Sequence, residues 1–211
     1  MLKKRRSSLV IDTLLNWIDG DGVAVAYVYC DFSAQNVQSA STVLASVLRQ
    51  IVGALEKTPD EIQKAFERAR KADGCGLLLP EILDMLIQSL SSLKQGFICI
   101  DALDEFPVKQ RAQLWGSLQR VVRECPSTRL FLTGRLQIKA EVERYFARDA
   151  YMLTIEPTSD DITRYIDERL KEDLETSTID GGLQVDIRRA IPKRVPGMYV
   201  LTQGVEFLRL G

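Results

Sequence analysis

The sequence contains no histidine, and this absence excludes more enzyme classes than any other feature of its composition. Without an imidazole the chain cannot form a Ser–His or Cys–His nucleophile pair, cannot use histidine as a general acid or base, and cannot build a mixed Cys/His zinc site. Its few cysteines form no C-x-x-C pair and are far apart: Cys30, Cys75, Cys99 and Cys125. Cys30 and Cys99 lie in apolar segments, so we expect buried, reduced thiols there.

The sequence also lacks a strong net charge and a long apolar run. Its 28 basic and 29 acidic side chains give a net charge of −1, so no global field favours nucleic acid or acidic substrates. No apolar run approaches the roughly 18 residues that a membrane span requires. The basic residues at 3–6 lead into an amphipathic stretch rather than into the apolar core of a signal peptide. We therefore expect a cytoplasmic protein with no nucleic-acid or membrane partner.

The hydrophobic pattern predicts strands that alternate with helices, followed by helices alone. Strand-like apolar runs occur at 23–30, 97–101, 129–133 and 151–155. Helical periodicity is found at 7–18, 42–55, 58–73, 80–91, 108–123, 138–146, 159–170, 184–194 and 198–210. Alternation predicts an α/β fold, a parallel sheet covered by helices on both faces. We predict a core domain over residues 1–156 and a small helical subdomain over 157–211.

An acidic group follows the predicted strand at 97–101. Asp101 is the last residue of that strand, and Asp104 and Glu105 follow in the next turn. In a parallel sheet, a carboxylate at the carboxyl end of a strand points into the crevice where ligands bind. Three carboxylates this close suit Mg²⁺, which keeps several waters and bridges phosphate oxygens. An ordinary solvated turn after a buried strand would explain the same residues.

The strand predicted at 129–133 ends in Thr133, Gly134 and Arg135. This order delivers a hydroxyl and a guanidinium to the edge of the sheet where Asp101 is expected. An arginine there could bind a γ-phosphate and so distinguish a triphosphate from a diphosphate. A surface ion pair is the simpler role for Arg135, but both strand ends converge on one crevice.

Several segments resemble those of a known family. Asp-Ala-Leu-Asp-Glu at 101–105 resembles the extended Walker B motif of NACHT-family NTPases, which are P-loop NTPases of the STAND class, and residues 131–135 resemble their sensor strand. Segments similar to fungal NACHT proteins with a nephrocystin-like N-terminal NTPase region occur at 7–12, 27–32, 161–165 and 197–201. The resemblance covers nearly the whole chain in the right order.

The resemblance implies an ATP/ADP-dependent signalling switch, placed in such proteins between an N-terminal effector and C-terminal ankyrin or WD-type repeats. It implies that Asp101 holds Mg²⁺, that Asp104 or Glu105 supports hydrolysis, and that Arg135 senses the γ-phosphate. The helical subdomain at 157–211 would then be a lid.

One part of the family pattern is absent. The 211 residues contain no G-x-x-x-x-G-K-[ST] loop, whose backbone amides and lysine bind phosphates. By the family's spacing, Lys3 falls at the position of the loop lysine, and the glycines would precede Met1. The strand before that loop normally lies in the middle of the sheet, between the strands at 129–133 and 151–155. We expect a sheet that lacks this strand and either re-pairs its neighbours or folds marginally.

These observations leave three functional hypotheses. The leading one is a truncated NACHT module in which binding of Mg²⁺ and ATP or ADP, and hydrolysis, are weak or lost. The second is a non-catalytic scaffold that associates with itself or with full-length NACHT proteins through exposed sheet edges or the helical subdomain. The third, a Mg²⁺-dependent phosphohydrolase without a P-loop, would need more convergent carboxylates than Asp101, Asp104 and Glu105.

Overall fold

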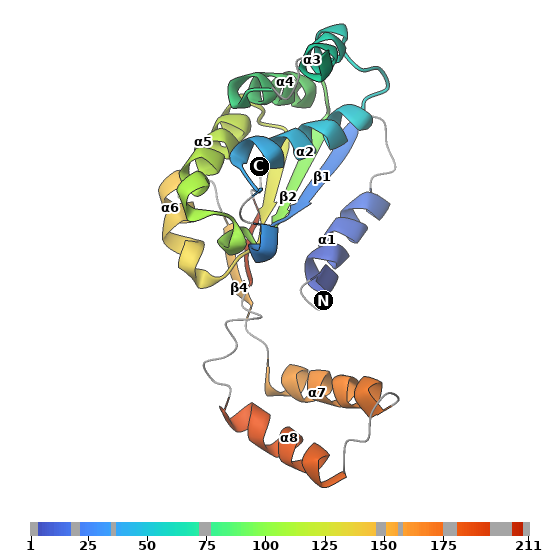
Figure 1. The fold of residues 1–211 in the computed structure, drawn as a ribbon, viewed down its shortest axis with the longest axis vertical. Coiled ribbons are helices and arrows are strands. Elements are labelled where there is room, and N and C mark those ends of the chain that lie inside the picture. Colours follow the sequence, from blue (N-terminus) through green and yellow to red (C-terminus); the bar gives the residue numbers. More distant parts are fainter. Residues whose placement is uncertain are drawn as a thin grey trace. The chain divides into compact units, whose positions relative to one another are not determined.

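The computed structural model divides into two compact units, one of residues 1–153 with 205–211 and one of residues 154–204. It describes residues 4–17, 22–34, 37–71, 77–146, 151–155, 158–174, 181–194 and 204–208. In the first unit, a sheet lies among helices, and in the second two helices follow one another (Figure 1). The division at 156/157 made from the sequence remains a prediction.

Three parallel strands form the centre of the sheet: β1 (Val23–Tyr29), β2 (Gln95–Asp101) and β3 (Thr128–Leu132). β1 pairs with β2 from Val23↔Gln95 to Tyr29↔Asp101, and β2 pairs with β3 from Gly96↔Thr128 to Ile100↔Leu132. Each strand is a short apolar run, as expected for parallel strands covered on both faces. The α/β class predicted from the sequence is confirmed, with all three carboxyl ends at one edge.

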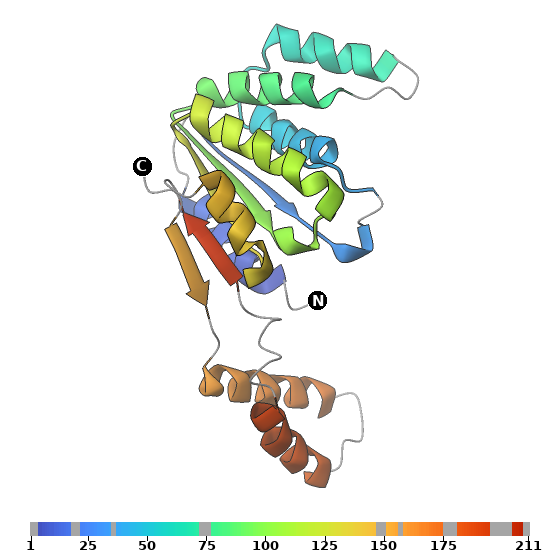
Figure 2. The same cartoon turned by 90° about the vertical axis from the view of Figure 1, so that its left-hand side faces the viewer.

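One face of the sheet is covered by α2 (Ala40–Gly53), α4 (Leu79–Ser91) and α5 (Val108–Glu124). The strand residues of this face are buried and small or aliphatic: Ala24, Ala26, Ile98, Ile100, Leu130 and Leu132. These three helices carry the large buried side chains of the main core, among them Trp115, Leu44 and Leu86. Figure 2 shows the helices stacked along the sheet.

The opposite face of the sheet packs against α1 (Lys4–Trp17). Ile11 of this helix forms a second, smaller core with Cys99 and Phe131, and Val25 lies at its edge. Strand side chains alternate between the two faces, which explains why consecutive residues such as Ile98 and Cys99 belong to different cores. The sheet is therefore the middle of three layers.

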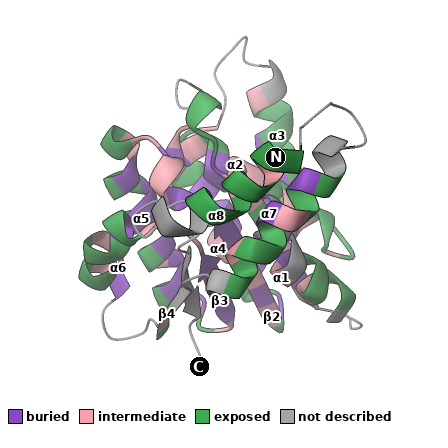
Figure 3. Cartoon of the chain, turned by 90° about the horizontal axis from the view of Figure 1, so that it is seen from below, coloured by how far each residue is buried: buried purple, intermediate pink, exposed green. Residues whose placement is uncertain are grey.

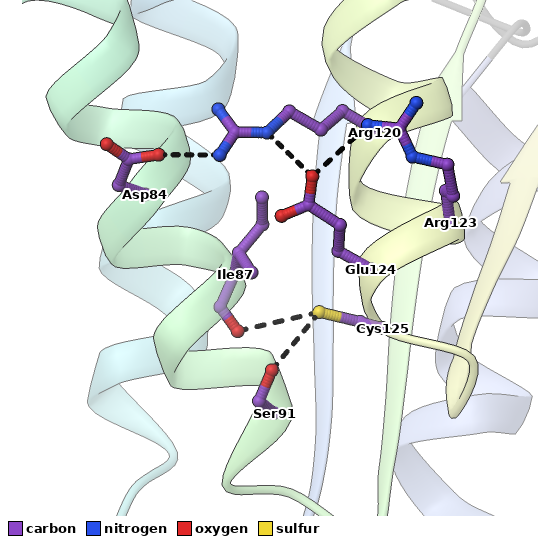
Figure 4. Close-up of polar contacts among 7 residues, drawn as sticks. All are labelled: Asp84, Ile87, Ser91, Arg120, Arg123, Glu124 and Cys125. Atoms are coloured by element: carbon purple, nitrogen blue, oxygen red, sulfur yellow. Dashed lines mark hydrogen bonds and ion pairs between the residues drawn. The ribbon is translucent and has the colours of Figure 1, made fainter.

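An ion pair joins the surfaces of α4 and α5 (Figure 4). Arg120 of α5 lies 2.9 Å from Asp84 of α4 and also 2.9 Å from Glu124, one turn further along its own helix. The hydrogen bond from Arg120 lowers the pKa of Glu124. Beneath this pair, the buried thiol of Cys125 lies 3.5 Å from the Ser91 hydroxyl. These contacts link the two helices at their exposed side and beside the buried Cys125.

The remaining helices of the first unit are α3 (Asp60–Lys71) and α6 (Lys139–Phe146). Three single-turn 3-10 helices follow the carboxyl ends of the parallel strands: η1 (Phe32–Ala34), η2 (Leu103–Glu105) and η3 (Leu136–Ile138). Three short turns therefore lie together at the carboxyl edge of the sheet.

The sheet has a strand that the sequence did not predict. β5 (Gly204–Leu208) pairs with β3 in the antiparallel direction, Phe131↔Leu208 and Leu132↔Phe207, and β4 (Tyr151–Ile155) follows it in the order β1-β2-β3-β5-β4. The helix predicted over 198–210 is therefore wrong at 204–208, and its other residues lie outside those described. The physical reason is the open edge of β3, whose unpaired backbone groups need a partner. β5 therefore lies between the two strands that we expected to be left as neighbours, β3 and β4, and closes the gap between them.

The second unit contains α7 (Ser159–Leu174) and α8 (Gly181–Arg194). An ion pair of 2.6 Å between Arg188 and Asp167 joins the two helices. The side chain of Thr158 accepts the Asp161 N–H, so Thr158 is the N-cap of α7. Most described residues of this helix pair are exposed, as their green colour in Figure 3 shows. Among the described residues, no helix is both long and apolar enough to cross a membrane.

Candidate functional site

Asp101 and Thr133 meet at the carboxyl edge of the sheet. Asp101 is the last residue of β2, and Thr133 directly follows β3. The Thr133 hydroxyl donates a hydrogen bond to Asp101 Oδ1 and accepts one from the Ala102 N–H at 3.0 Å. The hydroxyl thereby fixes the direction of the Asp101 carboxylate.

The chain leaves β2 through a left-handed residue. Ala102 has φ 54° and is the only non-glycine residue with positive φ among those described. Its carbonyl accepts the Glu105 N–H at 2.8 Å, and the Leu103 N–H donates to the Thr133 carbonyl at 2.9 Å. This bend starts η2 and sends Asp104 and Glu105 back toward the end of β3.

Arg135 is held by the two carboxylates that follow Asp101. Asp104 Oδ1 accepts the backbone N–H of Arg135 at 3.2 Å, and Asp104 Oδ2 lies 3.2 Å from its Nε. Glu105 Oε1 lies 3.8 Å from Arg135 Nη2. The side chain of Asp104 is only 6% exposed and that of Arg135 is 29% exposed. The backbone and Nε of Arg135 are therefore held by Asp104, while the end of its guanidinium group is accessible to solvent.

Glu105 also contacts the turn that follows β1. Its Oε2 accepts the backbone N–H of Phe32 at 3.3 Å. Phe32 opens η1 and is 70% exposed. Beside it, Ser33 donates hydrogen bonds from its N–H and its hydroxyl to Asp31 Oδ1, at 2.8 and 2.7 Å. The turns after β1, β2 and β3 are thus joined through side chains.

Arg111 of α5 supports η2 from within the protein. Its Nη2 donates to the carbonyls of Asp104 at 3.2 Å and Phe106 at 3.0 Å, and its Nη1 pairs with Glu141 of α6 at 2.8 Å. The Trp115 indole N–H donates to the same Glu141 carboxylate at 2.6 Å. We did not predict this network. One feature of the sequence could have indicated it: the charged residue Arg111 lies four positions before Trp115, so both side chains share one face of the helix.

The site carries a negative field. Burial, together with the charges of Asp101, Asp104 and Glu105, raises the pKa of the Cys30 thiol to about 12. Burial followed by the charge of Asp101 also raises the pKa of Tyr29. Both groups lie at the end of β1, so the field extends across the edge of the sheet. A bound cation would reduce it.

The donor set fits Mg²⁺ held by few protein ligands. Asp101 supplies one carboxylate whose orientation is fixed by Thr133. No group of three acidic or cysteine side chains within the described part of the chain could bind a metal by itself. Magnesium commonly uses one or two carboxylates and completes its shell with water and phosphate oxygens. The residues therefore suit a Mg²⁺ ion that arrives with a phosphate ligand.

The predicted site residues lie close together, with one exception. Asp104, Glu105 and Arg135 are in mutual contact, and Asp101 stands at the start of the same turn. Lys3 lies outside the described residues. The catalytic, metal-binding and nucleotide-binding roles of these residues remain predictions.

The site falls within a region shared with a known family. The family model described as nephrocystin 3, N-terminal, matches residues 3–135, well over half of the chain. The match ends at Arg135, so it includes β1, β2, β3 and the predicted site residues Lys3, Asp101, Asp104, Glu105 and Arg135. No curated protein matches the sequence.

Proposed function

The chain belongs to the nephrocystin 3 N-terminal family, and we propose that it is part of a nucleotide-regulated signalling switch of the NACHT class. In this proposal the carboxyl edge of the sheet binds Mg²⁺ with ATP or ADP, weakly and with little or no hydrolysis. The observation that carries it is the oriented Asp101 carboxylate beside an anchored arginine at the end of parallel strands. Ligands of parallel α/β sheets bind at this edge.

Asp101 is proposed as the protein ligand of Mg²⁺. When bound, the ion would neutralise phosphate charge and bridge phosphate oxygens. Thr133 keeps the carboxylate in place by donating to one of its oxygens. Arg135 is proposed to bind a terminal phosphate with its guanidinium tip, which distinguishes ATP from ADP.

The contacts of the two other carboxylates favour different roles for them. Asp104 is nearly buried, and both of its carboxylate oxygens contact Arg135. These contacts suit a residue that positions the arginine better than one that acts as a catalytic base. Glu105 is more exposed, at 16%, and is the better candidate to orient an attacking water. Hydrolysis is expected to be weak, because these 211 residues contain no phosphate-binding glycine loop.

A non-catalytic scaffold is the second candidate. It is favoured by the ion pairs that already neutralise Arg135, since a phosphate must compete with Asp104 and Glu105 for the guanidinium. In this role the contacts would simply stabilise the sheet edge, and the chain would associate with itself or with full-length NACHT proteins. The two candidates differ in whether the chain binds nucleotide.

Calorimetric titration with ATP and ADP, with and without Mg²⁺, tests the proposal. We expect Mg²⁺-dependent binding that Asp101→Asn abolishes. Asp84→Asn is the matched control, because Asp84 is a carboxylate on the surface of α4 whose partner is Arg120 (Figure 4). Absence of binding at millimolar nucleotide, with circular dichroism showing a folded chain, would reject the nucleotide switch and favour the scaffold.

A further inference from the structure

The Glu105 carboxylate contacts the turns on both sides of its own. Its Oε1 lies 3.8 Å from Arg135 Nη2, after β3, and its Oε2 accepts the Phe32 N–H at 3.3 Å, after β1. Glu105 itself belongs to η2, after β2. A single side chain therefore connects the arginine of the candidate site to the turn after β1.

The two carboxylates bind Arg135 with different strength. Asp104 Oδ1 accepts the backbone N–H of Arg135, and its Oδ2 forms an ion pair, not a hydrogen bond, with Arg135 Nε at 3.2 Å; the Asp104 side chain is only 6% exposed. Glu105 approaches at 3.8 Å and is 16% exposed. Shorter, better-shielded ion pairs are the stronger ones. Asp104 therefore anchors Arg135, and the Glu105 contact is the one that an incoming anion displaces.

We propose that Glu105 couples the binding of a phosphate-type anion at Arg135 to the turn η1 that carries Phe32. That the anion is a phosphate rests on the proposed function. The contacts of Glu105 with Arg135 and Phe32 are observed independently of it. A phosphate oxygen at Arg135 Nη2 competes with Glu105 Oε1 and repels the carboxylate's charge. Glu105 then moves away from the Phe32 N–H, and η1 loses this attachment to η2.

The turn η1 has internal hydrogen bonds of its own. The bonds from the Ser33 N–H and hydroxyl to Asp31 lie within the turn and do not involve Glu105. They keep its internal shape when the bond to Glu105 breaks. Phe32 is 70% exposed, so its ring changes position at the surface without disturbing the core. In this proposal, binding of an anion at Arg135 therefore displaces the apolar side chain of Phe32.

The first experiment tests the coupling without any ligand. The chain has seven phenylalanines, so selective ¹⁵N-phenylalanine labelling gives a simple amide spectrum in which Phe32→Leu identifies the Phe32 signal. We expect Arg135→Gln to shift the Phe32 signal, and we expect Glu105→Ala to reduce that shift by at least half. An equal shift in both backgrounds, or none in either, would overturn the inference. The other six signals report whether each variant is folded.

The second experiment adds the anion. Magnesium tripolyphosphate and Mg·ATP are titrated into the labelled protein, with binding measured in parallel by calorimetry. The Phe32 signal should move with the same concentration dependence as binding, and Glu105→Ala should remove most of this movement. Arg120→Gln, which removes a surface ion pair on α5, should leave it unchanged. Binding of the anion without movement of the Phe32 signal overturns the inference. Absence of binding overturns the proposed function instead. In that case the ligand-free experiment still decides whether Glu105 couples Arg135 to Phe32.

Discussion

The Thr133 hydroxyl donates to the Asp101 carboxylate and accepts the Ala102 N–H, so one side chain satisfies both groups at the end of β2. Thr133→Val keeps the shape of the side chain and removes both bonds. We expect it to lower the free energy of unfolding by about 1–3 kcal/mol, because a buried amide loses its acceptor and a carboxylate loses its donor. Urea unfolding measures the change. Thr133→Ser keeps the hydroxyl, and an equal loss in both variants would show that the methyl group matters instead.

The left-handed conformation of Ala102 predicts an order of stability at this position. A β-carbon at φ 54° costs about 1 kcal/mol, which Ala102→Gly removes, although glycine adds a similar entropy to the unfolded chain. We expect the glycine variant to unfold within about 1 kcal/mol of the parent. Ala102→Val should be clearly less stable, because a β-branched residue fits this conformation poorly. A valine variant as stable as the parent in thermal unfolding would contradict the backbone geometry.

Gly134 lies where a side chain would collide with η3. A β-carbon at this position would overlap Ile138 Cδ1 and stand 3.1 Å from its Cγ1, and Ile138 is fully buried. Gly134→Ala should therefore cost about 1–3 kcal/mol of stability. Adding Ile138→Val removes the Cδ1 atom and should recover part of the loss in the double variant. Additive losses in chemical denaturation would exclude this steric contact.

Removal of Glu141 should destabilise the support of η2. Its carboxylate pairs with Arg111, whose side chain is 10% exposed, and accepts the Trp115 N–H. We expect Glu141→Ala to cost about 2–3 kcal/mol, since it leaves a nearly buried guanidinium and an indole N–H without this acceptor. Glu143→Ala is the matched control, because Glu143 lies on the same helix, is 54% exposed and forms a 3.8 Å pair with Lys139. Similar melting temperatures for the two variants would contradict the prediction.

Two buried thiols predict a loss of stability at alkaline pH. Burial raises the pKa of Cys30 and of Cys99 from 9.0 to about 12, and both thiols are free. Their contribution is complete below pH 9 and is lost as the pH rises toward 12, because the unfolded thiols ionise first. Each should lower the free energy of unfolding by about 1.4 kcal/mol between pH 8 and pH 10. Cys99→Ala should reduce this slope, and an unchanged slope would refute the assignment.

The parallel core could be predicted from the sequence because its signals are local. The runs around Val25, Ile98 and Phe131 are apolar, short and separated by helical periodicity, and this pattern alone specifies covered parallel strands. The position of Asp101 follows from the same pattern, since a residue that ends a parallel strand must reach the carboxyl edge. The predicted layers and the position of Asp101 at the end of β2 therefore agree with the structure.

The other features depend on contacts between distant residues. Arg135 and Asp104 are 31 positions apart, and no local pattern indicates that the arginine is paired rather than free. β5 is short, and its pairing is decided by the open edge of β3 more than by its own composition. Thr158 and Ser159 are both good capping residues, and only the bond from the Asp161 N–H identifies Thr158 as the N-cap of α7.

Because β5 returns to the sheet, the helical unit lies in the chain between two strands of that sheet, β4 and β5. β4 and β5 are neighbours that point in opposite directions (Figure 2), so residues 156–203 are, topologically, the loop of a hairpin. The entropy of closing a loop rises only slowly with its length, by about 0.6 kcal/mol per doubling. Changes in the length of this segment should therefore have little effect on the stability of the sheet.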